Sequence, residues 1–157
     1  MKKLIHISMI GVVTILTLLE SCSKSNASAN QPSNPPASNP STDMVSGTWT
    51  ITSLIQRSED KTSAFKGFIF TFLSTGNVKA DKNGAVTEGT WAYYPAAVGY
   101  YGSTPSKASF TINLGAASPF ETLTKTWNID STKTNSSTLS LISPEVAENM
   151  RVTFSKN

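Results

Sequence analysis

Apolar and polar residues alternate with a period of two through most of residues 44–157. This is the period of a β-strand that buries one of its two faces. The alternation predicts about eight strands, at 48–55, 68–73, 78–80, 86–93, 108–114, 126–130, 138–142 and 150–154. These segments are rich in Thr, Val, Ile and aromatic residues, which favour strands. Only residues 117–123 predict a turn of helix, with Pro119 at its first position.

Short polar turns separate the predicted strands. The clearest are S-T-G-N at 74–77, D-K-N-G at 81–84 and K-T-N-S at 133–136. Short links between successive strands imply an antiparallel meander, and eight such strands can close into a barrel without exposed edges. We therefore predict an all-β domain, an eight-stranded antiparallel up-and-down barrel. A two-sheet β-sandwich is the alternative that buries the same faces.

The alternation also predicts which side chains face the interior. All three tryptophans are among them. The predicted inward residues are Trp49, Ile51, Phe68, Phe70, Phe72, Val78, Trp91, Tyr93, Phe110, Ile112, Leu114, Trp127, Ile129, Leu139, Leu141, Met150, Val152 and Phe154. An eight-stranded barrel is either filled by side chains or holds one small ligand. Either these residues form a solid core, or some of them line an apolar pocket at one mouth. The candidates for such a core or pocket are Trp49, Phe70, Trp91, Tyr93 and Trp127.

One link between strands is long, at residues 95–107. Within it, Gly99 and Gly102 bracket Tyr100 and Tyr101. Tyrosine offers a large contact area at a small entropic cost, so Tyr100 and Tyr101 are candidates for a lid or a partner contact. The alternative is that both side chains pack back onto the end of the barrel.

The order of residues from Gly47 onward resembles the small lipocalin-like domains of Bacteroidetes lipoproteins. The similar order is G-T-W-T-I-T-S, K-T-S, F-x-F, T-G-N-V, G-T-W, L and W-N-I, and it runs across most of residues 44–156. The resemblance implies an up-and-down barrel that binds a small apolar ligand. It also implies an arginine of the last strand packed across Trp49. Arg151 is the candidate, although alternation places it on the face opposite to Met150.

The first 21 residues resemble a bacterial lipoprotein signal peptide. Lys2 and Lys3 precede an apolar run at 4–19, and the letters L-E-S-C at 19–22 resemble a lipobox. In such proteins the signal is removed before the cysteine, which is acylated, and several acyl chains anchor a protein firmly to a membrane. We expect Cys22 to be the site of lipid attachment. An uncleaved N-terminal membrane anchor is the alternative.

Residues 22–43 form a tether in this interpretation, and residues 44–157 form the barrel domain. Residues 23–43 contain no Leu, Ile, Val or aromatic residue, so they offer too little apolar area to offset the entropy of ordering. No aspartate follows Cys22, which favours delivery to the outer membrane. The sequence leaves open whether the domain faces the periplasm or the cell surface.

Composition argues against most catalytic chemistry. His6 is the only histidine and lies in the predicted signal, and Cys22 is the only cysteine, so the mature chain lacks a catalytic histidine and a His-based metal site. Removing Lys2, Lys3 and Glu20 from the 13 basic and 10 acidic residues leaves a net charge of +2, without a basic stripe for nucleic acid. The letters D-S-T at 130–132 resemble an O-glycosylation motif of Bacteroidetes secreted proteins.

These features predict a lipid-anchored protein of the cell envelope whose lipocalin-like domain binds a small apolar ligand. The alternative is a non-catalytic interaction module that presents its barrel surface to another envelope protein. We expect no enzymatic activity, no cofactor, no metal and no nucleic-acid partner.

Overall fold

The computed structural model describes residues 39–99, 101, 104 and 106–157. In that part of the chain the helical segments are short: α1 (Pro40–Met44) and the 3₁₀ turns η1 (Thr62–Phe65), η2 (Phe120–Thr122) and η3 (Val146–Glu148). The strands are β1 (Trp49–Gln56), β2 (Glu59–Asp60), β3 (Ile69–Phe72), β4 (Asn77–Lys82), β5 (Ala85–Tyr94), β6 (Ser109–Asn113), β7 (Lys125–Ile129), β8 (Thr138–Ile142) and β9 (Met150–Lys156).

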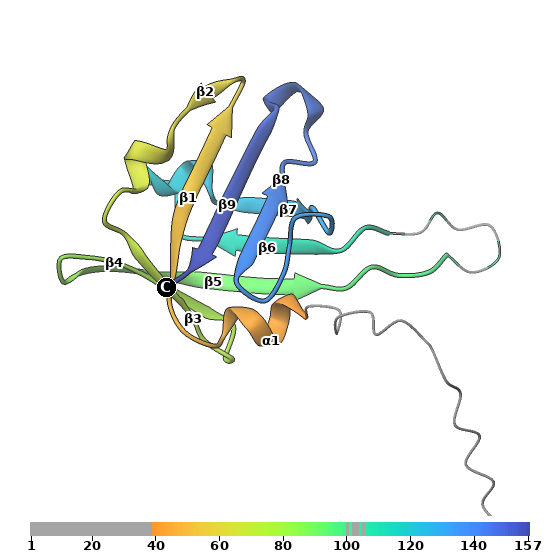
Figure 1. Cartoon of the computed structure of the whole chain (residues 1–157), viewed down its shortest axis with the longest axis horizontal. Coiled ribbons are helices and arrows are strands. Elements are labelled where there is room, and N and C mark those ends of the chain that lie inside the picture. Colours follow the sequence, from red (N-terminus) through yellow and green to blue (C-terminus); the bar gives the residue numbers. More distant parts are fainter. Residues whose placement is uncertain (1–38, 100, 102–103, 105) are drawn as a thin grey trace, which may run out of the picture. The chain divides into compact units, whose positions relative to one another are not determined.

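β1 and β3 to β9 form a closed antiparallel barrel (Figure 1). Strands β3 to β8 each pair with the next one in sequence, and β1 closes the barrel by pairing with β3 and β9. The β1–β9 ladder runs from Trp49↔Lys156 to Gln56↔Met150. β2 pairs only with the end of β1, as a hairpin at the barrel's edge. The predicted eight-stranded up-and-down barrel is therefore confirmed, and the sandwich alternative is wrong.

A bulge in β1 changes the predicted alternation. Ile51 pairs with Phe154 whereas Ser53 pairs with Thr153, so Thr52 is an additional residue in β1. An additional residue reverses which side chains face inward beyond it. Leu54 is consequently buried, at 1% exposure, where strict alternation predicts that Ser53 faces the interior.

β1 and β3 have the shortest ladder in the barrel, because they pair only at Trp49↔Phe70. Beyond that pair, η1 and the residue before it supply hydrogen-bond partners for backbone groups of β1 that β3 does not reach. The Leu54 amide donates to Thr62 Oγ1 at 2.8 Å, and the Lys61 amide donates to the Leu54 carbonyl at 2.8 Å. Phe65 of η1 is buried and covers the core at this seam.

The inward side chains form one core. Every predicted inward residue is buried, except that Phe68, Tyr93 and Ile129 are partly buried and pack against the core. The structure adds six residues to the hydrophobic core that are not among those predicted: Met44, Leu54, Phe65, Ala80, Phe120 and Leu123. Four of these lie in α1, η1, η2 or directly after η2, so the short helical segments close gaps in the barrel. Only η2 lies where the sequence predicts a helical turn.

α1 attaches the chain to the barrel before β1 begins. It includes residues 40–43, which the sequence analysis places in the tether, and both Pro40 and Met44 are buried. The Asn39 side chain caps its start by accepting from the Ser41 amide. Trp49 Nε1 donates to the Met44 carbonyl at 3.0 Å, which ties α1 to the core. No helix within the described residues is long and apolar enough to span a membrane.

The residue that packs across Trp49 is Lys156, and the expectation of Arg151 is wrong. Arg151 is exposed and pairs with Ile55 and Ile142, on the face opposite to the core. Lys156 Nζ lies 5.3 Å from the centre of the Trp49 ring. The same amine donates to Ser46 Oγ at 2.8 Å, so the last strand holds the start of β1 in place.

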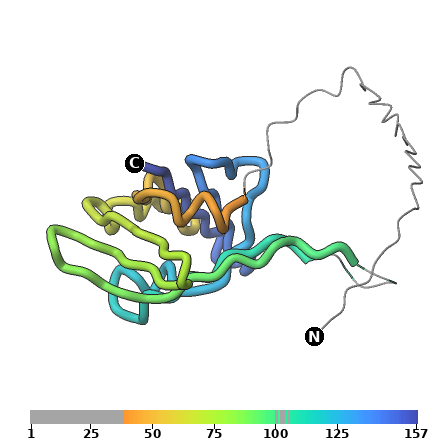
Figure 2. The backbone as a smooth tube through the Cα atoms, turned by 90° about the horizontal axis from the view of Figure 1, so that it is seen from below, coloured from red at the N-terminus to blue at the C-terminus, as the bar shows by residue number. Residues whose placement is uncertain are grey.

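Beyond β5 and before β6 the chain extends away from the barrel (Figure 2). We call the described residues of 94–108 the arm. Its two sides are bridged at Ala97↔Ser106, where the Ser106 amide donates to the Ala97 carbonyl at 3.0 Å.

Candidate functional site

The barrel interior is filled by side chains. Trp49, Phe110, Trp127 and Phe154 each have 0% exposure. A side chain that lines a cavity large enough for a ligand has surface accessible to water within that cavity, and these side chains have none. Of the two interpretations left open by the sequence, the structure therefore supports the solid core.

Ring contacts show how the interior is packed. Phe72 is the centre, with ring centroids 5.6 Å from Trp91, 5.8 Å from Phe110 and 5.9 Å from Phe154, all edge to face. Such geometry is favourable for aromatic pairs. Trp91 Nε1 also donates to the Leu73 carbonyl at 2.9 Å. The aromatic side chains are thus held by specific contacts, and a ligand has no room among them.

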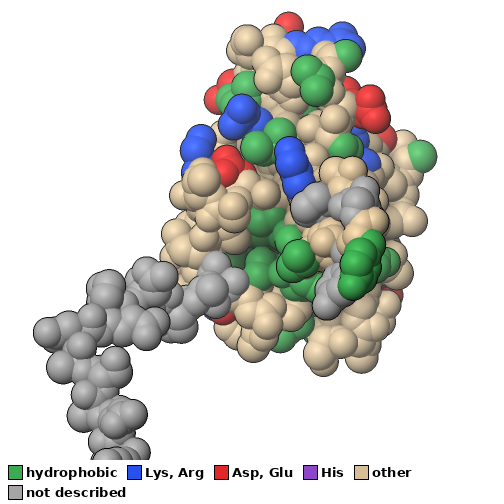
Figure 3. Space-filling view, turned by 90° about the vertical axis from the view of Figure 1, so that its right-hand side faces the viewer, with side chains coloured by type: hydrophobic (Ala, Val, Ile, Leu, Met, Phe, Trp, Pro, Cys, Tyr) green, Lys and Arg blue, Asp and Glu red, His purple; other side chains and the backbone are tan. Residues whose placement is uncertain are grey.

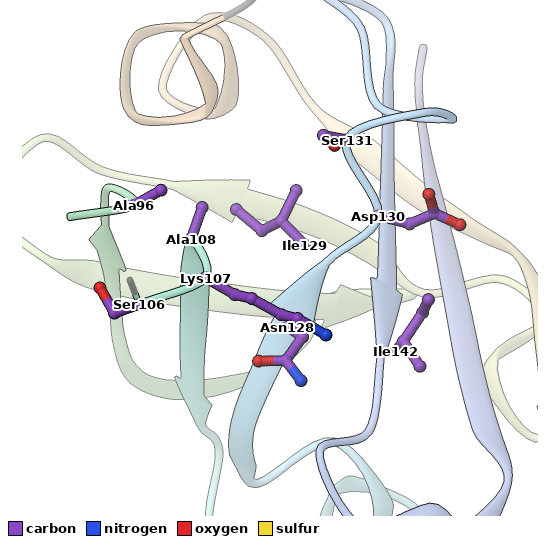
Figure 4. A pocket seen from close by; sticks show the side chains of 9 residues that line it. All are labelled: Ala96, Ser106, Lys107, Ala108, Asn128, Ile129, Asp130, Ser131 and Ile142. Carbon is purple, nitrogen blue, oxygen red and sulfur yellow. The ribbon is translucent and has the colours of Figure 1, made fainter. Parts of the chain in front are cut away.

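Two hollows open at the barrel end from which the arm projects. The smaller, of about 110 Å³, is lined by Pro40, Tyr93, Ala108, Ile129, Ser131 and Thr134. The larger, of about 480 Å³, is lined by Ala96, Ser106, Lys107, Ala108, Asn128, Ile129, Asp130, Ser131 and Ile142 (Figure 4). Because the two hollows share Ala108, Ile129 and Ser131, we treat them as one surface, the mouth cleft.

The mouth cleft exists because β7 leaves β6 at this point. The β6–β7 ladder ends at Ser109↔Asn128, followed by one bond from the Ile129 amide to the Ala108 carbonyl at 3.0 Å, whereas the chain after β7 stays beside β8 through the Asp130 amide, which donates to the Ser140 carbonyl at 2.9 Å. The arm continues outward while β7 turns toward β8. The space between them is the larger hollow.

The cleft combines an apolar side with a polar rim. Figure 4 shows Ala108 and Ile129 pointing toward α1, while Asn128 points the opposite way. This follows from the alternation along β7. The Lys107 side chain extends along the rim toward Asn128. Figure 3 looks onto this end of the barrel and shows hydrophobic side chains gathered in and beside a hollow.

Asp130 gives the rim a negative charge. Its Oδ1 accepts hydrogen bonds from the Thr132 hydroxyl at 2.6 Å and from the Thr132 amide at 3.2 Å. These bonds, the hydroxyl first, hold the pKa of Asp130 below its usual range. The carboxylate is therefore charged at neutral pH, on the same rim as the ammonium group of Lys107. In the D-S-T motif, Ser131 and Thr132 are both exposed.

The arm carries exposed apolar side chains next to the cleft. Tyr94 is 58% exposed, Val98 is 85% exposed and Tyr101 is 100% exposed. Tyr101 has a φ of +45° and lies in a turn. It does not pack back onto the barrel end. Tyr100 lies outside the described residues.

Of the five candidate core or pocket residues, four lie in the core. Trp49, Phe70, Trp91 and Trp127 are buried, and Tyr93 alone lines the mouth cleft. Cys22, the predicted lipid-attachment site, lies outside the described residues. Ala96, Ser106 and Lys107 were not predicted, because small and polar residues in a long link carry no periodic signal. Asn128 was not predicted because alternation places it on the outer face of its strand.

A second polar cluster lies at another edge of the barrel. Glu148 Oε2 accepts from Lys125 Nζ at 2.5 Å and from the hydroxyl of the buried Ser143 at 2.6 Å. These bonds, that of Lys125 first, lower the pKa of Glu148. The cluster joins β7 to the link between β8 and β9, which is a structural role. Among the described residues, no group of three His, Cys, Asp or Glu side chains is placed to hold a metal ion.

Comparisons with known proteins give a likeness to a solved structure. No protein-family model matches the chain, and no curated protein matches it. Among solved structures, the chain is similar to a DUF4847 family protein from Bacteroides vulgatus. The two are 19% identical, the match covers 73% of this chain and 94% of that chain, and the TM-score is 0.47. A likeness at this level concerns the fold alone.

Proposed function

We propose that this protein is a lipid-anchored, lipocalin-like binding protein of the cell envelope that holds a small amphiphilic ligand in the mouth cleft. The observation that carries the proposal is the contrast between the filled interior and the open cleft of about 480 Å³. Ligand sites of small molecules commonly have volumes of about 300–1,000 Å³. The cleft lies in this range.

The lining of the cleft defines the ligand class. Ile129, Ala96 and Ala108 offer apolar surface, which suits a short hydrocarbon or aromatic body, and Ile142 adds apolar surface on the face of Asn128, its partner across β7 and β8. The Lys107 side chain lies beside Asn128 and apart from the Asp130 carboxylate (Figure 4), and these two side chains suit a ligand head with negative charge or hydrogen-bonding oxygen atoms. The proposed ligand is therefore apolar at one end and polar at the other, rather than the fully apolar molecule that a lipocalin-like interior suggests.

A dye titration tests this site. The probe is 1-anilinonaphthalene-8-sulfonate, which has an aromatic body and one negative charge, and the readout is its fluorescence with the folded full chain. Ala96→Trp should block the cleft and weaken binding several-fold. The matched control is Ala85→Trp, because Ala85 is also exposed but lies at the opposite end of β5. Equal binding by the two variants would contradict the proposed site.

Lipid anchoring requires a separate experiment. Cells that express the chain are fed a clickable fatty acid, and the wild type should carry the label while Cys22→Ala should not. Native mass spectrometry of the purified protein then shows whether an amphiphile is retained. A labelled protein without a bound amphiphile would support the anchor and weigh against the ligand.

A second candidate function is a non-catalytic contact with another envelope protein. It is favoured by the filled interior, because a barrel without an internal pocket must recognise partners with its outer surface. Ile69 and Val86 are exposed and flank Asp81 in one row across β3, β4 and β5. Crosslinking in cells should then trap one dominant protein, and Ile69→Ser should reduce its yield.

A further inference from the structure

The described domain begins beside the base of the arm. Asn39 is its first residue, and the buried Pro40 lines the smaller hollow together with Tyr93 and Ala108, where the arm leaves the barrel. Everything N-terminal to Asn39, including Cys22, is joined to the domain at this point. The 17 residues from Ser23 to Asn39 span at most roughly 60 Å, at ~3.3–3.6 Å per residue.

The arm presents apolar and aromatic groups at this same end. Tyr94, Val98 and Tyr101 are all more than half exposed, and the chain between β5 and β6 that carries them extends away from the barrel (Figure 2). Tyrosine is favoured at the boundary between lipid headgroups and hydrocarbon, because its ring is apolar and its hydroxyl is polar. An apolar arm of this kind suits a lipid surface.

The charges of the two ends of β5 differ. Between residues 94 and 108 the only charged residue is Lys107, so the arm carries no acidic group that an anionic bilayer would repel. The opposite end, at the β4–β5 hairpin, carries charges of both signs, those of Lys79, Asp81, Lys82 and Glu88. Along β5 the two ends are separated by roughly 30 Å, at ~3.3 Å per residue.

We infer that the arm rests on the surface of the lipid bilayer to which the chain is tethered, with Tyr94, Val98 and Tyr101 in the headgroup region. The inference rests on the proposed lipid anchor, and it assigns the membrane-facing end of the domain. In this orientation the mouth cleft opens toward the bilayer. An amphiphile then enters the cleft from lipid rather than from water.

Side-chain footprinting tests the contact. The full chain is anchored in vesicles of phosphatidylethanolamine and phosphatidylglycerol, and oxidation by hydroxyl radicals is measured by mass spectrometry before and after release with detergent. Tyr94 and Val98 should be oxidised several-fold more slowly on vesicles. Val86, which is 50% exposed at the other end of β5, should be oxidised at the same rate in both states. Oxidation rates of Tyr94 and Val98 that do not change between vesicles and released protein would overturn the inference.

Further experiments test the contact of the arm with lipid separately from the lipid anchor. Attachment of the chain through Cys22 to a maleimide-bearing lipid imposes the tether chemically, so the footprint decides the arm's contact even where cells do not acylate Cys22. The fatty-acid label decides the anchor independently. Protection in membranes isolated from cells but not in protein-free vesicles would show that a protein covers the arm, which contradicts a lipid contact. Val98→Ser should reduce the protection of Tyr94, whereas Val86→Ser should leave it unchanged.

Discussion

Gly89 is the position at which a single methyl group should most disturb the barrel. A Cβ atom at Gly89 would lie 2.0 Å from the Asn113 carbonyl oxygen, 2.9 Å from the Asn113 carbonyl carbon and 3.0 Å from Leu114 Cα. All three are backbone atoms of the end of β6 and the residue after it, so no side chain can rotate away. The absence of a side chain at Gly89 is what lets the chain after β6 cross so close to β5.

The cost of Gly89→Ala follows from this contact. The two backbones must separate by more than about 1 Å, which adds the strain of overpacking and weakens ladder hydrogen bonds next to Trp91. We expect a loss of about 2–4 kcal/mol in the free energy of unfolding. For a domain of this size, that corresponds to a fall of roughly 10–20 °C in Tm.

Urea unfolding measured by tryptophan fluorescence is the assay, because all three tryptophans are buried. Gly84→Ala is the matched control. Gly84 has a φ of +86°, and no atom lies within 4 Å of the position that a Cβ atom would take there, so its cost is conformational, about 1–2 kcal/mol. If Gly89→Ala were no more destabilising than Gly84→Ala, the close approach of β5 and β6 would be refuted.

Three further predictions concern stability. The folded-state pKa of Glu148 is depressed, so its contribution to the free energy of unfolding is present above the ordinary carboxyl pKa and is lost as pH falls through the lowered value. Glu148→Gln should therefore cost about 1 kcal/mol at pH 7 and flatten the acid limb of a curve of stability against pH. Glu88→Gln, which removes an exposed ion pair, should have almost no effect. Lys156→Met removes the cation above Trp49 and should lower the free energy of unfolding in urea by about 0.5–1 kcal/mol. An unchanged unfolding midpoint would contradict a structural role for Lys156. Phe72→Ala should cost about 3–5 kcal/mol and create a cavity that binds xenon, whereas wild type should bind none in its interior.

The strands were predictable because each of them buries one face and exposes the other. That regularity placed Phe70, Phe110 and Val152 in the core, and it fails where the chain departs from a regular strand. Leu54 was missed because the bulge at Thr52 reverses the alternation. Phe65 was missed because a 3₁₀ turn has no two-residue period.

The site was less predictable than the fold. The volume of the interior depends on how Phe72 and its neighbours pack, which alternation does not specify. The mouth cleft depends on where the β6–β7 ladder ends, after Ser109↔Asn128, and this point is not marked by composition. Ala96 and Ser106 become site residues only through that geometry. The sequence did indicate the long link, and the arm it forms is the exposed apolar feature next to the cleft.

The most direct test of the account asks where a ligand binds. A photoreactive fatty acid with a diazirine in its chain is incubated with the full chain, irradiated, and mapped by mass spectrometry. The account predicts adducts at the mouth cleft, on Ala96, Ala108, Ile129 or Ile142, and none in the interior. Adducts on Phe72 or Phe154, with the cleft unlabelled, would contradict the claim that the barrel is solid and binds at its mouth.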